Sequence, residues 1–185
     1  MSDFQREAEL CARLAALRRI LPRPAIVREP TFGVANVLAA LGGFMECVRY
    51  LNTRRSAGAI LKLEEEAHVQ DAVYIMLRLW VTDLQYENPT DKIGNRYVIK
   101  DFLIPSLKTV VEAKFVRDKT HGKNISKELH DDIEMYSRHP LCEELVFFVY
   151  DPDKYIPDVG ALSDDIVRPR QYGNKGLRTH LVVRP

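Results

Sequence analysis

Two apolar runs that meet at a single proline constrain the fold of this chain more than any other feature. The stretch "DFLIPSLKTVVEAKF", residues 101–115, reads as two strands joined around Pro105, which predicts a β-hairpin. Yet Asp101 opens the first strand, and Glu112 and Lys114 interrupt the second. Because a buried charge is costly unless it is paired or coordinates a metal, these three residues need a physical explanation.

The geometry of a hairpin brings the three charges together. In a strand, residues two apart share a face, so Glu112 and Lys114 point the same way. If the turn centres between Ser106 and Leu107, Asp101 lies opposite Glu112, with Cβ atoms roughly 5 Å apart. Two carboxylates this close repel each other unless a cation lies between them, and oxygen ligands suit a hard divalent ion such as Mg²⁺, or Mn²⁺. Lys114 would then activate a water or neutralise developing charge, which predicts metal-assisted hydrolysis of a phosphodiester.

A plainer interpretation of the same residues stays open. An acid two positions before a lysine also arises by chance, and a Glu112–Lys114 pair on a solvated edge hairpin would have no catalytic meaning. The context favours a site, because both acids lie in apolar strands on a hairpin that is flanked by predicted helices.

The rest of the chain predicts a mixed sheet between helices. The apolar periodicity favours helices over residues 3–21, about 34–52 and within 63–84, a basic loop, a helix from Ser126, and two further strands. In the helix within 63–84 the apolar stripe expected to be buried comprises Val69, Val73, Met76, Leu77, Trp80 and Leu84. This order indicates an α/β fold with a mixed central sheet. We divide the chain into an N-terminal helical region for docking or dimerisation, residues 1–55, and a core, residues 56–185.

Composition excludes several classes of function. The net charge of +1 gives no overall attraction to nucleic acid or to a membrane surface, so any anion-binding surface has to be local. The three cysteines form no C-x-x-C motif, which argues against a zinc ribbon. The N-terminus is too charged for a signal peptide, and the longest apolar run, residues 34–45, is short for a membrane span. We therefore expect a soluble cytoplasmic protein that has no membrane partner.

Several stretches, taken in order, resemble the PD-(D/E)XK nuclease superfamily and, within it, the restriction-endonuclease-like domains of the DpnII/MboI type. They are "HVQDAV" (68–73), Asp101, "EAK" (112–114), "DIEMYSRHP" (132–140), "FVYDPD" (148–153) and the closing "LVVRP". The resemblance covers about residues 60–185. It implies a restriction-endonuclease-like fold and a metal-dependent endonuclease.

The resemblance also implies roles for individual residues. Asp101 and Glu112 would bind the metal together with the carbonyl of Ala113, and Lys114 would be the catalytic base or a charge stabiliser. A residue of the preceding helix often assists in such folds, and the candidates are Glu66, Gln70 and Asp71. Acids at a helix start also stabilise the helix dipole, which is the alternative role for these residues. Asp132, Tyr136 and His139 are expected to act locally, within or beside their own helix.

The predicted loop after the second strand offers a surface for nucleic acid. Its basic residues are Arg117, Lys119, Lys123 and Lys127, which would hold phosphates unless the loop is simply solvated. The expected substrate is DNA, with RNA left open. The resemblance suggests an effector of a bacterial, antiviral defence system that acts with a partner protein or as a homodimer. The alternative is a non-catalytic subunit that keeps the fold and binds nucleic acid or protein.

Overall fold

The structure is a computed structural model that describes residues 32–54, 60–93, 96–172 and 175–185. The chain divides into two compact units, Met1–Phe32 and Gly33–Pro185, and the second is described below. The helix predicted over residues 3–21 lies outside the described residues.

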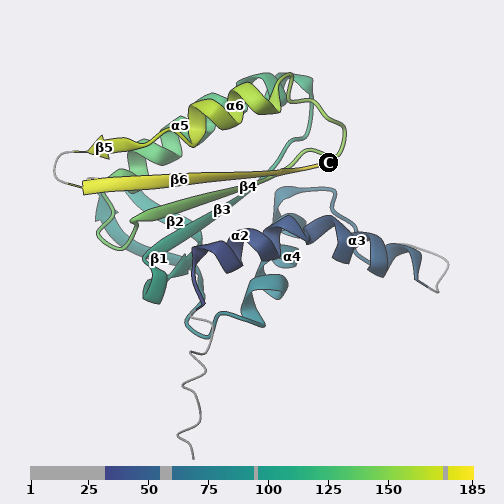
Figure 1. Cartoon of the computed structure of the whole chain (residues 1–185), viewed down its shortest axis with the longest axis horizontal. Coiled ribbons are helices and arrows are strands. Elements are labelled where there is room, and N and C mark those ends of the chain that lie inside the picture. The colour runs from purple at the N-terminus through teal and green to yellow at the C-terminus, as the bar shows by residue number, and fades with distance from the viewer. Residues whose placement is uncertain (1–31, 55–59, 94–95, 173–174) are drawn as a thin grey trace, which may run out of the picture. The chain divides into compact units, whose positions relative to one another are not determined.

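The second unit contains the predicted helices and strands in order (Figure 1). It also has strands over Gln85–Ile93 and Arg170–Tyr172 and a helix over Val159–Ile166, which the sequence did not predict. The helices are α2 (Val34–Gly42), α3 (Phe44–Thr53), α4 (Glu66–Arg78), α5 (Lys119–Ser137) and α6 (Val159–Ile166). The strands are β1 (Gln85–Ile93), β2 (Arg96–Ile104), β3 (Thr109–Phe115), β4 (Glu144–Tyr150), β5 (Arg170–Tyr172) and β6 (Lys175–Arg184).

The strands form one mixed sheet in the order β1-β2-β3-β4-β6-β5. β3, β4 and β6 run parallel to one another, whereas β1, β2 and β5 pair with their neighbours in antiparallel fashion. Every residue of β4 is buried, as expected of a central parallel strand that helices cover on both faces. The predicted α/β fold with a mixed sheet between helices is therefore confirmed.

The two faces of the sheet have separate cores. α5 and α6 cover one face, where Leu129, Ile133 and Ile166 pack against the even-numbered side of β3 and the odd-numbered side of β4 (Figure 1). α2 and α4 cover the other face. There, the ring of Phe44 lies 4.6 Å from that of Phe148, measured between centroids.

The first helices of this unit belong with the sheet, which differs from our division at residue 55. Val37, Leu41 and Phe44 are fully buried, and Arg184 Nε of β6 donates a hydrogen bond of 3.1 Å to the carbonyl of Gly42. The unit therefore begins at Gly33. The single helix predicted for about residues 34–52 is present as α2 and α3, which meet at Gly43.

The same pair of helices is longer than the apolar run suggested. Val34–Thr53 spans 20 residues with a mean hydropathy of 1.3, which by length and composition alone is enough to cross a membrane. A core helix of a soluble protein can be as long and as apolar, but it is mostly buried. In this structure 22% of the most apolar stretch of the segment is buried, including Val37, Leu41 and Phe44.

Two other helix boundaries differ from the prediction. α4 ends at Arg78, so Trp80 lies beyond it and is 69% exposed, while Val69, Val73, Leu77 and Leu84 are buried as expected. α5 begins at Lys119, well before Ser126, because the carboxylate of Asp118 caps it by accepting the His121 N–H at 2.8 Å. The predicted basic loop is therefore the first part of a helix.

Candidate active site

The hairpin of β2 and β3 opens at the end where the charged residues lie. Its register pairs Ile104 with Thr109 and Phe102 with Val111, where the pairing ends. This is the register that the turn geometry predicted, and Asp101 and Glu112 are the next residues along the two strands. A turn of 3₁₀ helix, Pro105–Leu107, connects the strands. Beyond the last pair the strands part, which frees the edge of β3 for contacts other than a neighbouring strand.

Two carboxylates occupy this freed edge. The N–H of Ala113 donates to Asp101 Oδ2 at 2.8 Å, and the N–H of Phe115 donates to Glu66 Oε2 at 3.4 Å. The N–H and C=O of one residue in a strand point to the same side, so the carbonyl of Ala113 faces the same edge. The edge therefore gathers acidic oxygens and one backbone carbonyl in one place.

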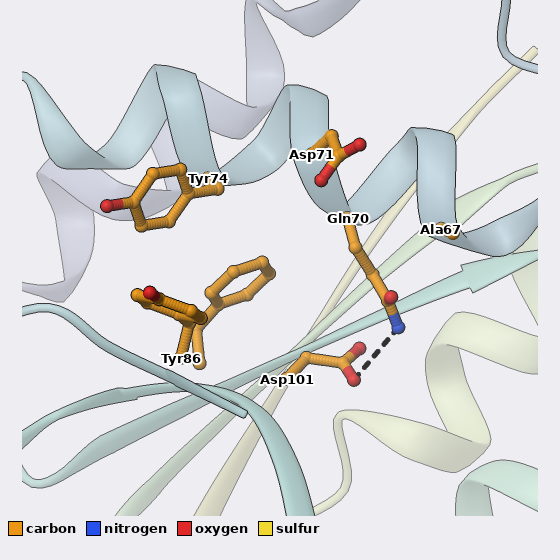
Figure 2. A pocket seen from close by; sticks show the side chains of 7 residues that line it. Ala67, Gln70, Asp71, Tyr74, Tyr86 and Asp101 are labelled. Carbon is orange, nitrogen blue, oxygen red and sulfur yellow. Dashed lines mark hydrogen bonds between the residues drawn. The ribbon is translucent and has the colours of Figure 1, made fainter. Parts of the chain in front are cut away.

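Asp101 is held from two directions. Gln70 Nε2 of α4 donates to its Oδ1 at 3.0 Å, and Figure 2 shows the amide reaching down from the helix to the carboxylate. Burial raises the pKa of Asp101 to about 6, although the hydrogen bond from Ala113 and the charge of Lys114 oppose this shift. Of the three helix candidates, Gln70 and Glu66 thus reach the opened edge, whereas Asp71 is exposed on the rim of the adjoining pocket.

Glu112 is more deeply buried, with 4% of its surface exposed. The Tyr136 hydroxyl of α5 donates a hydrogen bond to its Oε1, and Lys114 Nζ lies 3.9 Å from its Oε2. Burial, and then the neighbouring charge of Asp101, raise the pKa of Glu112 well above its ordinary value. The two carboxylates thus oppose each other's ionisation, which is the relation that a bound cation would reverse.

Lys114 sits within a cage of acids. Its Nζ lies 3.0 Å from Asp132 Oδ2 and 3.5 Å from Glu128 Oε1, besides the contact with Glu112. Burial alone would lower the pKa of Lys114, but the charges of Asp132 and Glu112 outweigh it and raise the pKa. The side chain is therefore an ammonium ion at neutral pH.

Sequence reasoning missed the contribution of α5. Glu128, Asp132 and Tyr136 are four residues apart, so they lie on one face of the helix, and all three contact Glu112 or Lys114. We had expected Asp132 and Tyr136 to act locally, which is wrong, because both reach across to β3. The four-residue spacing of two acids and a tyrosine was the available signal.

The donor set fits a hard divalent cation. Three carboxylates, those of Glu112, Glu128 and Asp132, contact the Lys114 ammonium ion. Those of Asp101 and Glu66 accept backbone N–H groups at the neighbouring edge of β3. Within the described part of the chain, no group of three or more His, Cys, Asp and Glu side chains is arranged to hold a metal ion. Two carboxylates and a carbonyl nevertheless suit Mg²⁺, which commonly takes one or two carboxylates and keeps several waters.

The predicted phosphate-binding residues lie at the start of α5. Arg117, Lys119, Lys123 and Lys127 are all exposed, and the three lysines are four residues apart along the helix. Arg117 and Lys127 line a surface hollow of about 370 Å³ that also includes His121 and Glu128. The lining also includes Asp118 and Asp131, so its three carboxylates outnumber its arginine and its lysine. Through Glu128, which also contacts Lys114, the hollow adjoins the acid cage.

The acid of the "FVYDPD" stretch has a different role. Asp151 is buried, and its two oxygens accept the N–H groups of Tyr155 and Ile156 at 2.8 and 2.9 Å. It therefore shapes the turn after β4, and the contacts of its carboxylate are to the backbone of its own turn.

An opened hairpin that sets two acids and a lysine against a flanking helix defines the restriction-endonuclease-like class of nucleases. The family model of the DpnII–MboI restriction endonucleases matches residues 35–182, and the chain belongs to this family. Because the members of this family are restriction endonucleases, the protein is an endonuclease that acts on DNA. No curated protein and no solved structure matches the chain.

Proposed function

We propose that this protein hydrolyses phosphodiester bonds of DNA with Mg²⁺ or Mn²⁺ bound at the opened edge of β3. The carboxylates of Asp101 and Glu112 and the carbonyl of Ala113 would hold the ion. The observation that carries the proposal is the convergence of Asp101, Glu112 and Lys114 at that edge, with both acids raised in pKa by burial. Such a site is unfavourable in the absence of a cation and favourable in its presence.

The bound ion would supply positive charge to polarise the phosphate and lower the pKa of an attacking water. The chain's own residues fix the donors. Gln70 and the N–H of Ala113 orient Asp101, and the hydroxyl of Tyr136 orients Glu112. Each carboxylate oxygen keeps a further lone pair for a ligand.

Lys114 acts as a charge stabiliser in this proposal. Sequence analysis left open whether it is a general base or a stabiliser, and a base would require a lowered pKa. The surrounding carboxylates instead raise the pKa, so the ammonium ion is suited to the negative charge that develops on the phosphate. Asp132 fixes its position through the 3.0 Å contact.

We also propose a biological setting for this activity. We place the protein in the cytoplasm as an effector of a bacterial defence system, working with a partner protein or as a homodimer. Exposed apolar side chains near the end of α4 support a protein contact, namely Ile75, Leu79 and Trp80. Contiguous exposed apolar residues of this kind commonly mark an interaction surface.

Cleavage of plasmid DNA and of RNA, with Mg²⁺, with Mn²⁺ and with EDTA, tests the proposed activity. We expect DNA to be cut in either metal and to stay intact in EDTA. Glu112→Gln should abolish cutting, whereas Glu143→Gln, a substitution of an exposed acid just before β4, should cut like the parent. Cutting that continues in EDTA would refute the metal, and a parent inactive on all substrates with its partner present would favour the non-catalytic alternative.

A further inference from the structure

A pocket of about 320 Å³ adjoins the candidate active site (Figure 2). Its walls come from α4 (Gln70, Asp71, Tyr74), from β1 (Tyr86) and from β2 (Asp101, Phe102). Asp101 is shared between this pocket and the opened edge of β3. A group bound in the pocket would therefore lie next to a phosphate held at the site.

The pocket has an aromatic side. The ring of Tyr74 lies 5.2 Å from that of Tyr86 in an edge-on arrangement and 6.4 Å from that of Phe102 in a stacked one, measured between centroids. Tyr86 is 60% exposed even though it is large and partly apolar. Aromatic faces that remain accessible at a pocket bind planar rings, and each base stacked on such a ring contributes about 1–3 kcal/mol.

The opposite side is polar and acidic. In Figure 2 the side chains of Gln70 and Asp101 meet beside the aromatic pair, and Asp71 lies on the helix above them. The described lining contains two carboxylates and neither lysine nor arginine. This charge disfavours a phosphate in the pocket and favours an uncharged planar group that carries N–H donors. Nucleobases with ring or exocyclic N–H groups have this chemistry, and carboxylate and amide side chains are their usual partners.

We propose that this pocket receives one unpaired nucleobase of the DNA substrate, from the nucleotide next to the phosphate that is cut. The inference rests on the proposed function, and it names the substrate as DNA with an unpaired base at the site. In a duplex both faces of a base are stacked, so a base can reach an aromatic wall only from a single strand or by extrusion from the helix.

Fluorescence anisotropy in Ca²⁺, which blocks hydrolysis, tests the pocket with labelled DNA of one length. The DNAs are a single strand, the same strand with abasic residues, a fully paired duplex and a duplex with one mismatch. The parent should bind the intact single strand about 5- to 150-fold more tightly than the abasic strand, as expected from one stacked base. If Tyr86→Ala weakens binding to the mismatched duplex, the base reaches the pocket by extrusion from the helix. If it weakens binding to the single strand alone, the base comes from single-stranded DNA.

The variant Tyr86→Ala should lose most of this difference. Tyr50→Ala is the matched control, because Tyr50 is 59% exposed and lies on α3. Equal binding of intact and abasic strands by the parent would overturn the proposal without any variant, as would an undiminished difference in Tyr86→Ala. Cleavage by the parent in Mg²⁺, measured in parallel, separates the two failures. A parent that cuts DNA without any effect of the base refutes the pocket alone, whereas one that binds the base but never cuts refutes the nuclease.

Discussion

Asp151 and Glu112 are both buried acids on or beside central strands, but their surroundings differ. The carboxylate of Asp151 accepts two backbone N–H groups of its own turn. Glu112 instead faces a second carboxylate, an ammonium ion and a tyrosine hydroxyl, and its pKa is raised by burial and by Asp101. The first arrangement is complete within the protein, whereas the second would become favourable on binding the proposed cation. Burial of an acid therefore does not distinguish a structural role from a functional one, but its partners do.

The largest effect is expected at the functional acid cage. Lys114→Ala should lower the rate of DNA cleavage by about 10²- to 10⁴-fold, because it removes a charge needed chiefly in the transition state. DNA affinity measured in Ca²⁺ should change little. Lys108→Ala is the control, since Lys108 is an exposed residue that pairs with Glu143 at 2.5 Å. Cleavage by Lys114→Ala at the parent's rate would show that the surroundings of Glu112 have no catalytic role. Glu112 would then differ from Asp151 in its partners but not in function.

The structural acid should show the opposite behaviour. Asp151→Ala leaves the N–H groups of Tyr155 and Ile156 without their acceptor, so the free energy of unfolding should fall by about 2–4 kcal/mol. Cleavage per folded molecule should be retained. Urea unfolding, with Asp153→Ala as the exposed control in the same turn, measures the loss. A loss of activity at full stability would place Asp151 in the site.

A smaller effect is expected from the pH dependence of the metal-free protein. The pKa of Asp101 is about 6 in the folded protein against an ordinary value of 3.8, so the folded state binds more protons than the unfolded state between these values. Stability should therefore fall as the pH rises from about 4 to about 6, and the raised pKa of Glu112 adds to the fall. Asp101→Asn should make this fall smaller and stabilise the protein at neutral pH by roughly 1–3 kcal/mol.

Urea unfolding in EDTA across this pH range, with exposed Asp164→Asn as the control, checks the prediction. If the parent and Asp101→Asn show parallel pH curves, Asp101 does not titrate in this window. Its carboxylate would then resemble that of Asp151 in being satisfied by the protein alone.

Much of the fold and the centre of the site could be predicted from sequence because both depend on local pattern. The proline turn and the apolar runs fix the β2–β3 register, which ends at the Phe102–Val111 pair, one position before Asp101 and Glu112. The order of helices and strands then indicates the mixed sheet. These features depend on neighbours in the chain, which is why the pattern is sufficient.

Other features depend on contacts that no local pattern records. The start of α5 reads as a polar loop, and its Gly122 is explained only by packing, since an added Cβ would lie 2.5 Å from the Tyr155 backbone. Trp80 has the spacing of a buried residue, but α4 ends before it. Asp132 and Tyr136 reach Glu112 and Lys114 only because α5 packs on that face of the sheet.

Calorimetric titration with Mn²⁺ tests most directly whether the facing acids form a cation site. The parent should bind Mn²⁺ with an affinity that falls as the pH is lowered, since burial raises the pKa of both Asp101 and Glu112 and a protonated carboxyl group binds the ion poorly. Glu112→Gln, which keeps the shape of the side chain, should lose this binding, and Glu143→Gln should keep it. Undiminished Mn²⁺ affinity in Glu112→Gln would contradict the account.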